Sequence, residues 1–230
     1  MKKLLLFFVF SILFISGCRE ISTETAIGNY EWNKATPKSQ NIDEAKLDLA
    51  FAAAEKLGFV DGLVIIRNGY LVGEEYYNGF SADKPHYIWS CTKSFVSAGV
   101  GIAIQKGFIE SLDKKIMDYF PEYKDVIRDA RYYDITIRHL LTMTMGIDRE
   151  SKIMVPVLQS YDWIRETLKL PLIYNPGTTH SYNSLQQHLI SVIIKKTSGM
   201  DLYEFTETFL TLPMGIHIND RDHDPKGNII

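Results

Sequence analysis

The segment FVSAGVGIAI, residues 95–104, is almost free of polar side chains, and its apolar residues point to every side of a helix. Such a helix is stable where other elements surround it, so we expect it to be enclosed in a hydrophobic core. Just before it stand Ser90 and Lys93, three residues apart. Buried helices rarely begin with a charge that has neither a partner nor a task, so this pair requires an explanation.

Two interpretations fit the pair. Residues three apart share one helix face, so an uncharged, desolvated Lys93 amine could take the proton of the Ser90 hydroxyl. Alternatively, Ser90 is an ordinary N-cap and Lys93 extends its charge to solvent. The same Ser-x-x-Lys spacing recurs at Ser81–Lys84 and Ser111–Lys114, but in a turn and in a charged surface stretch. Only the Ser90 pair precedes an apolar helix, where backbone N–H groups favour a developing anion.

Composition limits the class of protein. The chain has 230 residues, of which 46% are hydrophobic and 23% are charged, which is typical of one or at most two globular domains. The formal net charge is −3. Because no surplus of basic residues is present to neutralise phosphates, we expect no nucleic-acid partner.

The first residues have the pattern of a targeting segment. Met1-Lys2-Lys3 precedes the apolar run LLLFFVFSILFIS and then Gly17-Cys18, an order that resembles a bacterial lipoprotein signal peptide. The resemblance implies a signal peptide over 1–17, a lipidated Cys18, a polar tether over 18–40 and a folded domain over 41–230. It also implies a lipid-anchored protein of the bacterial cell envelope that faces the periplasm. A plain membrane anchor or secretory signal is the alternative.

Neither cysteines nor metal ligands dominate the remaining sequence. Without Cys18 only Cys91 is left, so no disulfide can form within the chain, and we expect Cys91 to be a packed small side chain. Asp220, Asp222 and Asp224 alternate as in a calcium loop, but Pro225 occupies the place of the turn glycine. No histidine has ligand spacing, and His139 is expected to pack or cap a helix. We therefore expect no metal and no cofactor.

Hydrophobic periodicity predicts the elements. The chain should contain a first helix with Leu47, Ala50, Phe51, Ala54 and Leu57 on one face, a hairpin that turns at Asn68-Gly69, and the helix after Ser90. Further helices are expected within 135–147, where Gly146 ends the segment, over 162–169, over 185–197 and over 201–210.

Longer motifs carry a family resemblance. The segments SCTKSFVSAGVGIAIQKGFIESLDKKIMDYFPEY, DITIRHLLTMTMGI and NPGTTHSYNSLQQHLISVIIKKTSG resemble, in order and spacing, serine hydrolases that include class C β-lactamases, penicillin-binding carboxypeptidases and related esterases and amidases. The resemblance covers about 63–215. It implies an α+β fold of the β-lactamase/transpeptidase type, with an antiparallel sheet flanked by helices and a helical subdomain. It further implies Ser90 as the acylated nucleophile, Lys93 as its proton partner and Tyr182 as the second motif.

The chain departs from this pattern twice. Where the lactamase motif reads Tyr-x-Asn, this sequence reads Tyr182-Asn183-Ser184, which places Ser184 as the substrate-binding residue and disfavours β-lactam hydrolysis. The family's third motif, a Lys-Thr-Gly on a C-terminal strand, has no counterpart, because residues 196–199 end a helix. We therefore expect a C-terminally incomplete chain with an incomplete sheet.

These observations predict a serine hydrolase that cleaves a small ester, amide or peptide through an acyl-enzyme on Ser90. Within the same class, a D-alanyl carboxypeptidase or a β-lactamase is the alternative. From another class, the missing third motif favours a non-catalytic or remnant penicillin-binding-like lipoprotein.

Overall fold

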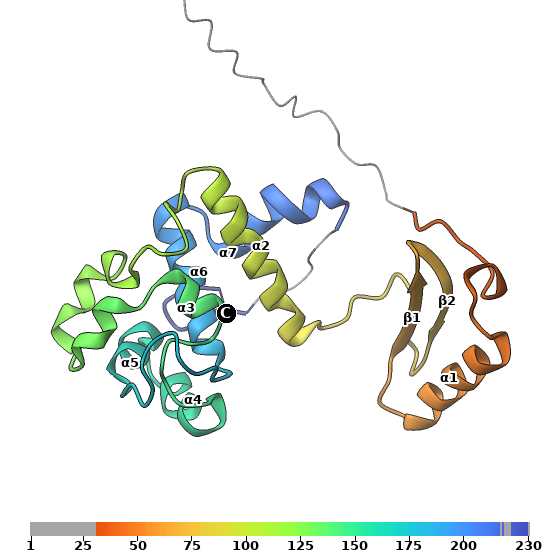
Figure 1. Cartoon of the computed structure of the whole chain (residues 1–230), viewed down its shortest axis with the longest axis horizontal. Helices are drawn as coiled ribbons and strands as arrows, with labels where there is room; N and C mark the ends of the chain where they lie inside the picture. The colour runs from red at the N-terminus through yellow and green to blue at the C-terminus, as the bar shows by residue number, and fades with distance from the viewer. Residues whose placement is uncertain (1–30, 217, 219–221, 230) are drawn as a thin grey trace, which may run out of the picture.

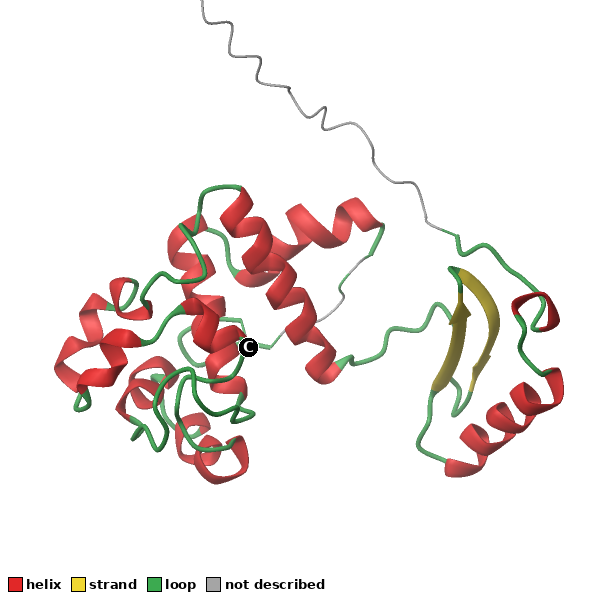
Figure 2. Ribbon diagram, viewed as in Figure 1, coloured by secondary structure: helices red, strands yellow, loops and turns green. Residues whose placement is uncertain are grey.

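The computed structural model describes residues 31–216, 218 and 222–229. Figure 1 shows two separate parts, a small unit of one helix and two strands and a larger helical body, joined by the extended segment that leads into α2. Figure 2 shows that both strands belong to the small unit and that helices and loops form the body. Residues 1–30, with the predicted signal peptide, Cys18 and most of the tether, lie outside the described residues.

Along the chain, one helix is followed by a β-hairpin and then by a series of helices. The described helices and strands are α1 (Glu44–Leu57), β1 (Gly62–Arg67), β2 (Tyr70–Tyr76), α2 (Thr92–Gln105), α3 (Ile137–Leu141), α4 (Glu150–Leu158), α5 (Trp163–Lys169), α6 (Ser184–Ser198) and α7 (Leu202–Thr206). Short 3₁₀ turns join them, among them η2 (Trp89–Cys91), η3 (Ile116–Asp118), η4 (Pro121–Val126) and η5 (Ala130–Asp134), and a π-helical turn, η6 (Glu207–Thr211), continues α7.

The small unit has the helix and hairpin that the sequence predicts. The Asp43 side chain caps α1 by accepting from the Lys46 N–H, and Gly58 ends the helix in the left-handed conformation. β1 and β2 pair antiparallel, with a bulge between Ile65 and Ile66. Leu47, Phe51 and Val72 form a core between α1 and one face of this sheet. On the β2 side, residues 33–35 add a short parallel bridge to Leu71.

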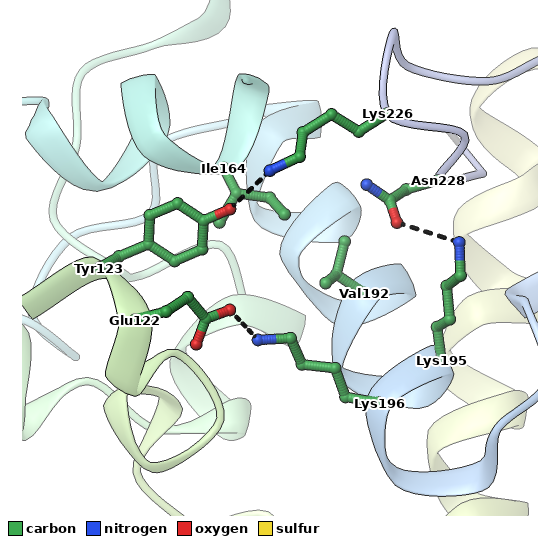
Figure 3. A pocket seen from close by; sticks show the side chains of 8 residues that line it. All are labelled: Glu122, Tyr123, Ile164, Val192, Lys195, Lys196, Lys226 and Asn228. Atoms are coloured by element: carbon green, nitrogen blue, oxygen red, sulfur yellow. Dashed lines mark hydrogen bonds and ion pairs between the residues drawn. The ribbon is translucent and has the colours of Figure 1, made fainter. Parts of the chain in front are cut away.

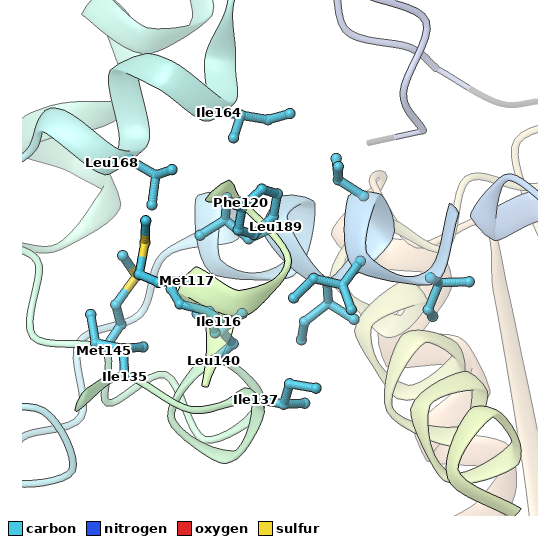
Figure 4. Packing of buried hydrophobic residues seen from close by; sticks show 14 of the residues in the cluster. Ile116, Met117, Phe120, Ile135, Ile137, Leu140, Met145, Ile164, Leu168 and Leu189 are labelled. Atoms are coloured by element: carbon cyan, nitrogen blue, oxygen red, sulfur yellow. The ribbon is translucent and has the colours of Figure 1, made fainter. Parts of the chain in front are cut away.

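The helical body has its own core. Buried side chains from α2, α3, α5, α6 and α7 pack with those of η3 to η5 into one hydrophobic cluster. Figure 4 shows this packing around α6, with Leu189 of that helix beside Phe120 and with Ile116, Ile137 and Leu140 in the layer next to them. α6 is buried over most of its circumference and is therefore the central element of the body.

The expectation that the helix after Ser90 is enclosed is wrong for the described residues. α2 packs one face against α6 and α7 through Val96, Gly99, Val100 and Ala103, whereas Ala98 on the other face is exposed. The residues on the exposed face of α2 are mostly small. The spacing of the large apolar side chains is therefore compatible both with a helix packed on one face and with a helix buried on all faces.

The central loops differ in part from expectation. The helix expected within 135–147 is the single turn α3, which Thr136 and His139 close as a reciprocal capping box, so the capping role of His139 is confirmed. Gly146 follows with a positive φ of 106°. α4 was not predicted, because Pro156 interrupts it and Arg149, its N-cap residue, forms no side-chain cap.

The C-terminal residues fold back on α6. Buried Asp224 accepts hydrogen bonds from His188 at 3.0 Å and from the Asn228 side chain at 2.9 Å, and Ser191 donates to the Ile229 carbonyl. Asp222 and Asp224 belong to no metal-ligand cluster within the part of the chain that is described, and Asp220 lies outside it. Among the described helices, none has the length and hydrophobicity needed to cross a bilayer.

Candidate active site

Ser90 and Lys93 stand at the N-terminal end of α2. Ser90 is the middle residue of η2, the 3₁₀ turn that leads into α2, and Lys93 is the second residue of α2. The helical spacing brings the two side chains together, and the Lys93 ammonium donates to the Ser90 hydroxyl at 3.2 Å. The positive end of the α2 dipole lies here and favours negative charge near Ser90.

Tyr182 reaches the same place from the loop before α6. Two backbone hydrogen bonds hold this loop, one from the Ser181 N–H to the Met143 carbonyl at 2.8 Å and one from the Glu150 N–H to the Tyr182 carbonyl at 3.0 Å. Asn183 is fully buried and caps α6 by accepting from the Leu185 N–H. The tyrosine is therefore presented by a fixed loop rather than by a regular element.

The structure brings Ser90, Lys93 and Tyr182 into one cluster. The hydroxyl oxygens of Ser90 and Tyr182 are 2.5 Å apart, and the Lys93 ammonium lies 5.1 Å from the centroid of the Tyr182 ring. The two hydroxyl groups come from residues 92 positions apart in the chain. A proton can pass directly from the serine to the tyrosine across this contact.

The electrostatics of the cluster favour an ionised tyrosine. The hydrogen bond with Ser90 lowers the pKa of Tyr182 below its ordinary value of 10.0, and the Lys93 ammonium lowers it further. Partial burial and the Glu150 carboxylate act in the opposite direction without cancelling the effect. Tyr182 thus has the direction of shift that a general base requires near neutral pH.

Ser184 is the first residue of α6, directly beyond the Tyr182 loop. Its backbone N–H donates to the Glu150 carboxylate at 2.7 Å. Its half-buried hydroxyl has no hydrogen-bond partner among the described residues. The substrate-binding role predicted for Ser184 thus stays a prediction, with a hydroxyl available for it.

The surface around Ser90 is open and carries aromatic side chains. Trp89 is 80% exposed, lies 6.1 Å from Tyr87 between ring centroids, and has a positive φ of 46°. A non-glycine residue in that conformation stores strain directly beside the candidate nucleophile. Cys91 is exposed, so the expectation of a packed side chain is wrong.

Glu150 is a site residue that the sequence did not indicate. Through its carboxylate and its backbone N–H it contacts both Ser184 and Tyr182, and the neighbouring Asp148 carbonyl accepts from Asn183 at 3.0 Å. An acidic residue 32 positions before the tyrosine has no recognisable spacing to it. Only the folded loop shows that Glu150 positions the Tyr182 segment.

Comparison with known proteins places these features in a family. The family model described as Beta-lactamase matches residues 53–218, which include Ser90, Lys93 and Tyr182. Among curated proteins, the ML-236A carboxylate methylbutanoyltransferase of Penicillium citrinum is 24% identical over 210 residues, which cover 74% of this chain and 49% of the relative. The chain spans about half the length of the curated relatives it matches.

Solved structures agree on the fold. A D-stereospecific amidohydrolase from Streptomyces sp. superposes with a TM-score of 0.57 and 19% identity, over 81% of this chain and 60% of the other. The octameric penicillin-binding protein homologue from Pyrococcus abyssi superposes with a TM-score of 0.56 and 21% identity, over 82% of this chain and 50% of the other. The α+β, β-lactamase/transpeptidase-like fold class is confirmed. With a family model matched over most of its length, this chain belongs to the β-lactamase family of serine hydrolases.

Proposed function

We propose that this protein cleaves an ester or amide bond through a covalent acyl-enzyme on Ser90. The observation that carries the proposal is the 2.5 Å contact between the Ser90 and Tyr182 hydroxyl groups, with the Lys93 ammonium beside both. A serine alone is a weak nucleophile, and an adjacent base is what activates it. Tyr182, with its lowered pKa, serves as that base.

The reaction has two halves. In the first, the Ser90 proton passes to the Tyr182 phenolate, the serine oxygen attacks the substrate carbonyl carbon, and the resulting intermediate collapses with cleavage of the C–O or C–N bond. Tyr182 returns its proton to the leaving group. In the second, Tyr182 takes a proton from water, the hydroxide attacks the acyl carbon, and Ser90 is released with its proton restored. Lys93 keeps Tyr182 ionised between these transfers.

We infer the preferred substrate class from Ser184. A hydroxyl at Ser184 can donate one hydrogen bond to a substrate carbonyl but lacks the paired donor and acceptor of an amide. We therefore assign simple esters as preferred substrates over β-lactams. The relatives support acyl chemistry in general, since one is named a methylbutanoyltransferase and another an amidohydrolase. The proposal includes a lipid anchor at Cys18 and a place in the bacterial cell envelope facing the periplasm.

The test is covalent labelling of the purified chain with a fluorescent fluorophosphonate. We expect one labelled serine, loss of labelling in Ser90→Ala, and unchanged labelling in Ser97→Ala, because Ser97 is exposed on the same helix and, among the described residues, forms no hydrogen bond with Tyr182 or Lys93. p-Nitrophenyl acetate should be turned over faster than nitrocefin or a D-Ala-D-Ala peptide.

Two results would contradict the proposal. Labelling that persists in Ser90→Ala would place the nucleophile elsewhere. If the circular dichroism spectrum shows a folded chain and the fluorophosphonate labels neither the wild type nor Ser90→Ala, the result would favour a non-catalytic lipoprotein of the same fold.

A further inference from the structure

A cavity of about 320 Å³ lies on the helical body between η4, α5, the end of α6 and the C-terminal residues. Its lining includes Tyr123, Lys195, Lys196, Lys226 and Asn228, and none of the candidate catalytic residues takes part in it. Figure 3 shows the three lysine side chains reaching toward one hollow from different directions, two from α6 and one from the C-terminal residues. The volume is at the lower end of the range for small-molecule sites.

The hydrogen bonds of the three lysines leave donors unused. The Lys195 ammonium donates to the Gly227 carbonyl and the Asn228 side-chain oxygen. The Lys196 ammonium donates to the Tyr119 carbonyl and the Glu122 carboxylate. Each ammonium has three N–H donors, so each of these two retains one without an acceptor among the described residues.

Lys226 repeats this pattern. Its ammonium donates to the Tyr123 hydroxyl at 3.1 Å and to the Asp162 carboxylate at 2.9 Å, which again leaves one N–H free within the described chain. The hydrogen bonds with Tyr123 and Asp162 raise the pKa of Lys226 above its ordinary value of 10.5, so the side chain is charged at neutral pH.

The charges in the cavity do not balance. Glu122 pairs with Lys196 and Asp162 pairs with Lys226, whereas the recorded contacts of Lys195 are to neutral oxygens only. Among the described residues, one positive charge of this cavity is therefore uncompensated. The Lys195 side chain is partly buried, and a cation near the low-dielectric protein interior attracts a counter-anion more strongly than a fully solvated one does.

We propose that this cavity binds an oxyanion with three unsubstituted oxygens, such as a phosphate group, through Lys195, Lys196 and Lys226. Three free N–H donors match three acceptor oxygens, and charge-assisted hydrogen bonds supply the affinity. A phosphodiester offers only two such oxygens and one charge, so it should bind more weakly. The phosphate can be inorganic phosphate or the terminal group of a phosphomonoester. The proposal concerns a site separate from Ser90 and does not depend on the proposed reaction.

Binding there would join elements that are distant in sequence. Lys226 belongs to the C-terminal residues that fold back on α6, and Lys195 and Lys196 belong to the last turn of α6 itself. An anion held by all three lysines fastens those residues to the body. We therefore expect ligand binding to raise the melting temperature as well as to give a saturable signal.

The experiment is isothermal titration of the full chain with inorganic phosphate, glycerol 3-phosphate and dimethyl phosphate, with ionic strength held constant by sodium chloride. We expect saturable binding of inorganic phosphate, of glycerol 3-phosphate, or of both. Comparison of their two affinities shows whether the site prefers free phosphate or a phosphomonoester. Dimethyl phosphate should bind about tenfold more weakly or not at all. Lys195→Gln should weaken binding about tenfold, because it removes one charged donor.

Lys124→Gln is the matched control. It removes the same charge from the exposed side of η4, outside the cavity, and should leave binding unchanged. The wild-type chain decides the question even where a variant fails to fold: if it binds neither inorganic phosphate nor the monoester at constant ionic strength, the proposal is wrong. Equal loss of binding in Lys124→Gln and Lys195→Gln would show general charge attraction and would also overturn it.

Discussion

At the scale of single residues, the proposed reaction depends on the transfer of one proton between Ser90 and Tyr182. Ser90 and Tyr182 are close enough to exchange it directly, and Lys93 contacts the serine while it lies beside the tyrosine ring. Removal of the Lys93 charge therefore does more than delete one hydrogen bond. It removes a cation that favours the phenolate and so alters the pH at which Tyr182 can act as a base.

The pH dependence of esterase activity should report this coupling. In the proposed reaction the base is the ionised form of Tyr182, so kcat/KM for ester hydrolysis should rise with pH and level off above a pKa that lies below 10.0. In Lys93→Gln the rise should move to higher pH, because the cation that favours ionisation is gone. The profile of kcat/KM from pH 5 to pH 11 measures both. An unshifted profile in Lys93→Gln would mean that Lys93 does not control the base.

Removal of the Tyr182 hydroxyl should lower activity more than removal of the Lys93 charge does. Tyr182→Phe keeps the ring and removes the proton acceptor, and we expect kcat to fall by about 10² to 10⁴. Residual binding of substrate, judged from KM, should change little. A Tyr182→Phe variant with near-normal kcat would assign the base role to another group.

At the scale of elements, a buried hydrogen bond between His188 and the Asp224 carboxylate holds the C-terminal residues against α6. The side chains of His188 and Asp224 are 2% and 0% exposed, and Asp224 also accepts from the backbone N–H groups of Lys226 and Asn228. Burial opposes ionisation of Asp224, but hydrogen bonds from His188 and Asn228 outweigh it and hold the pKa below its ordinary value of 3.8. The ionised carboxylate is thus part of the folded structure.

Asp224→Asn should release this contact. The substitution keeps the shape of the side chain but replaces a carboxylate that accepts hydrogen bonds from His188 and from two backbone N–H groups, so we expect a loss of about 2 kcal/mol in the free energy of unfolding. Urea denaturation measures the loss, and Asp222→Asn, an exposed change in the same segment, should cost almost nothing. Equal stability of the two variants would contradict the role given to Asp224.

The effect of acid on the free energy of unfolding follows from the lowered pKa of Asp224. A carboxyl group whose folded pKa lies below its unfolded value contributes stability that is present in full above the unfolded pKa. The contribution of Asp224 should therefore be complete above about pH 4 and decline as the pH falls further. In Asp224→Asn that part of the acid dependence should be absent.

Local patterns predicted several elements but not their contacts. Asn68 and Gly69 both have positive φ, as the hairpin signal required, and Gly199 ends α6 where the Ser-Gly stop predicted. The His188–Asp224 contact links residues 36 positions apart, so no local pattern reveals it, and the local spacing of Asp224 suggests only a calcium loop. In the candidate site, family motifs indicated Ser90, Lys93 and Tyr182, whereas Glu150 emerged only from the fold.

At the scale of the whole molecule, the described residues form two parts whose main hydrophobic cores differ greatly in size. The core of the helical body gathers side chains from at least five helices, whereas the small unit buries Leu47, Phe51 and Val72 between α1 and two strands. A two-stranded sheet with one helix is near the lower limit of independent stability. The two parts should therefore open with different free energies.

Native-state hydrogen exchange tests this difference. We expect the amides of β1 and β2 to exchange at least about tenfold faster than those in the middle of α6, because the smaller core opens at a lower free energy. Mass spectrometry of peptides from the two parts measures both rates in one sample. Equal protection of both parts would show that they unfold as one cooperative unit.

The conformation around Trp89 has an optical consequence. Trp163 is 8% exposed within the helical body, whereas Trp89 is 80% exposed and directly precedes Ser90 in the chain. The Trp89 indole is solvent-exposed, so its fluorescence should be quenched by a soluble quencher. An acyl group on the neighbouring serine oxygen changes the environment of the indole, so the intrinsic fluorescence of Trp89 can follow acylation and release in real time without any dye attached to the protein.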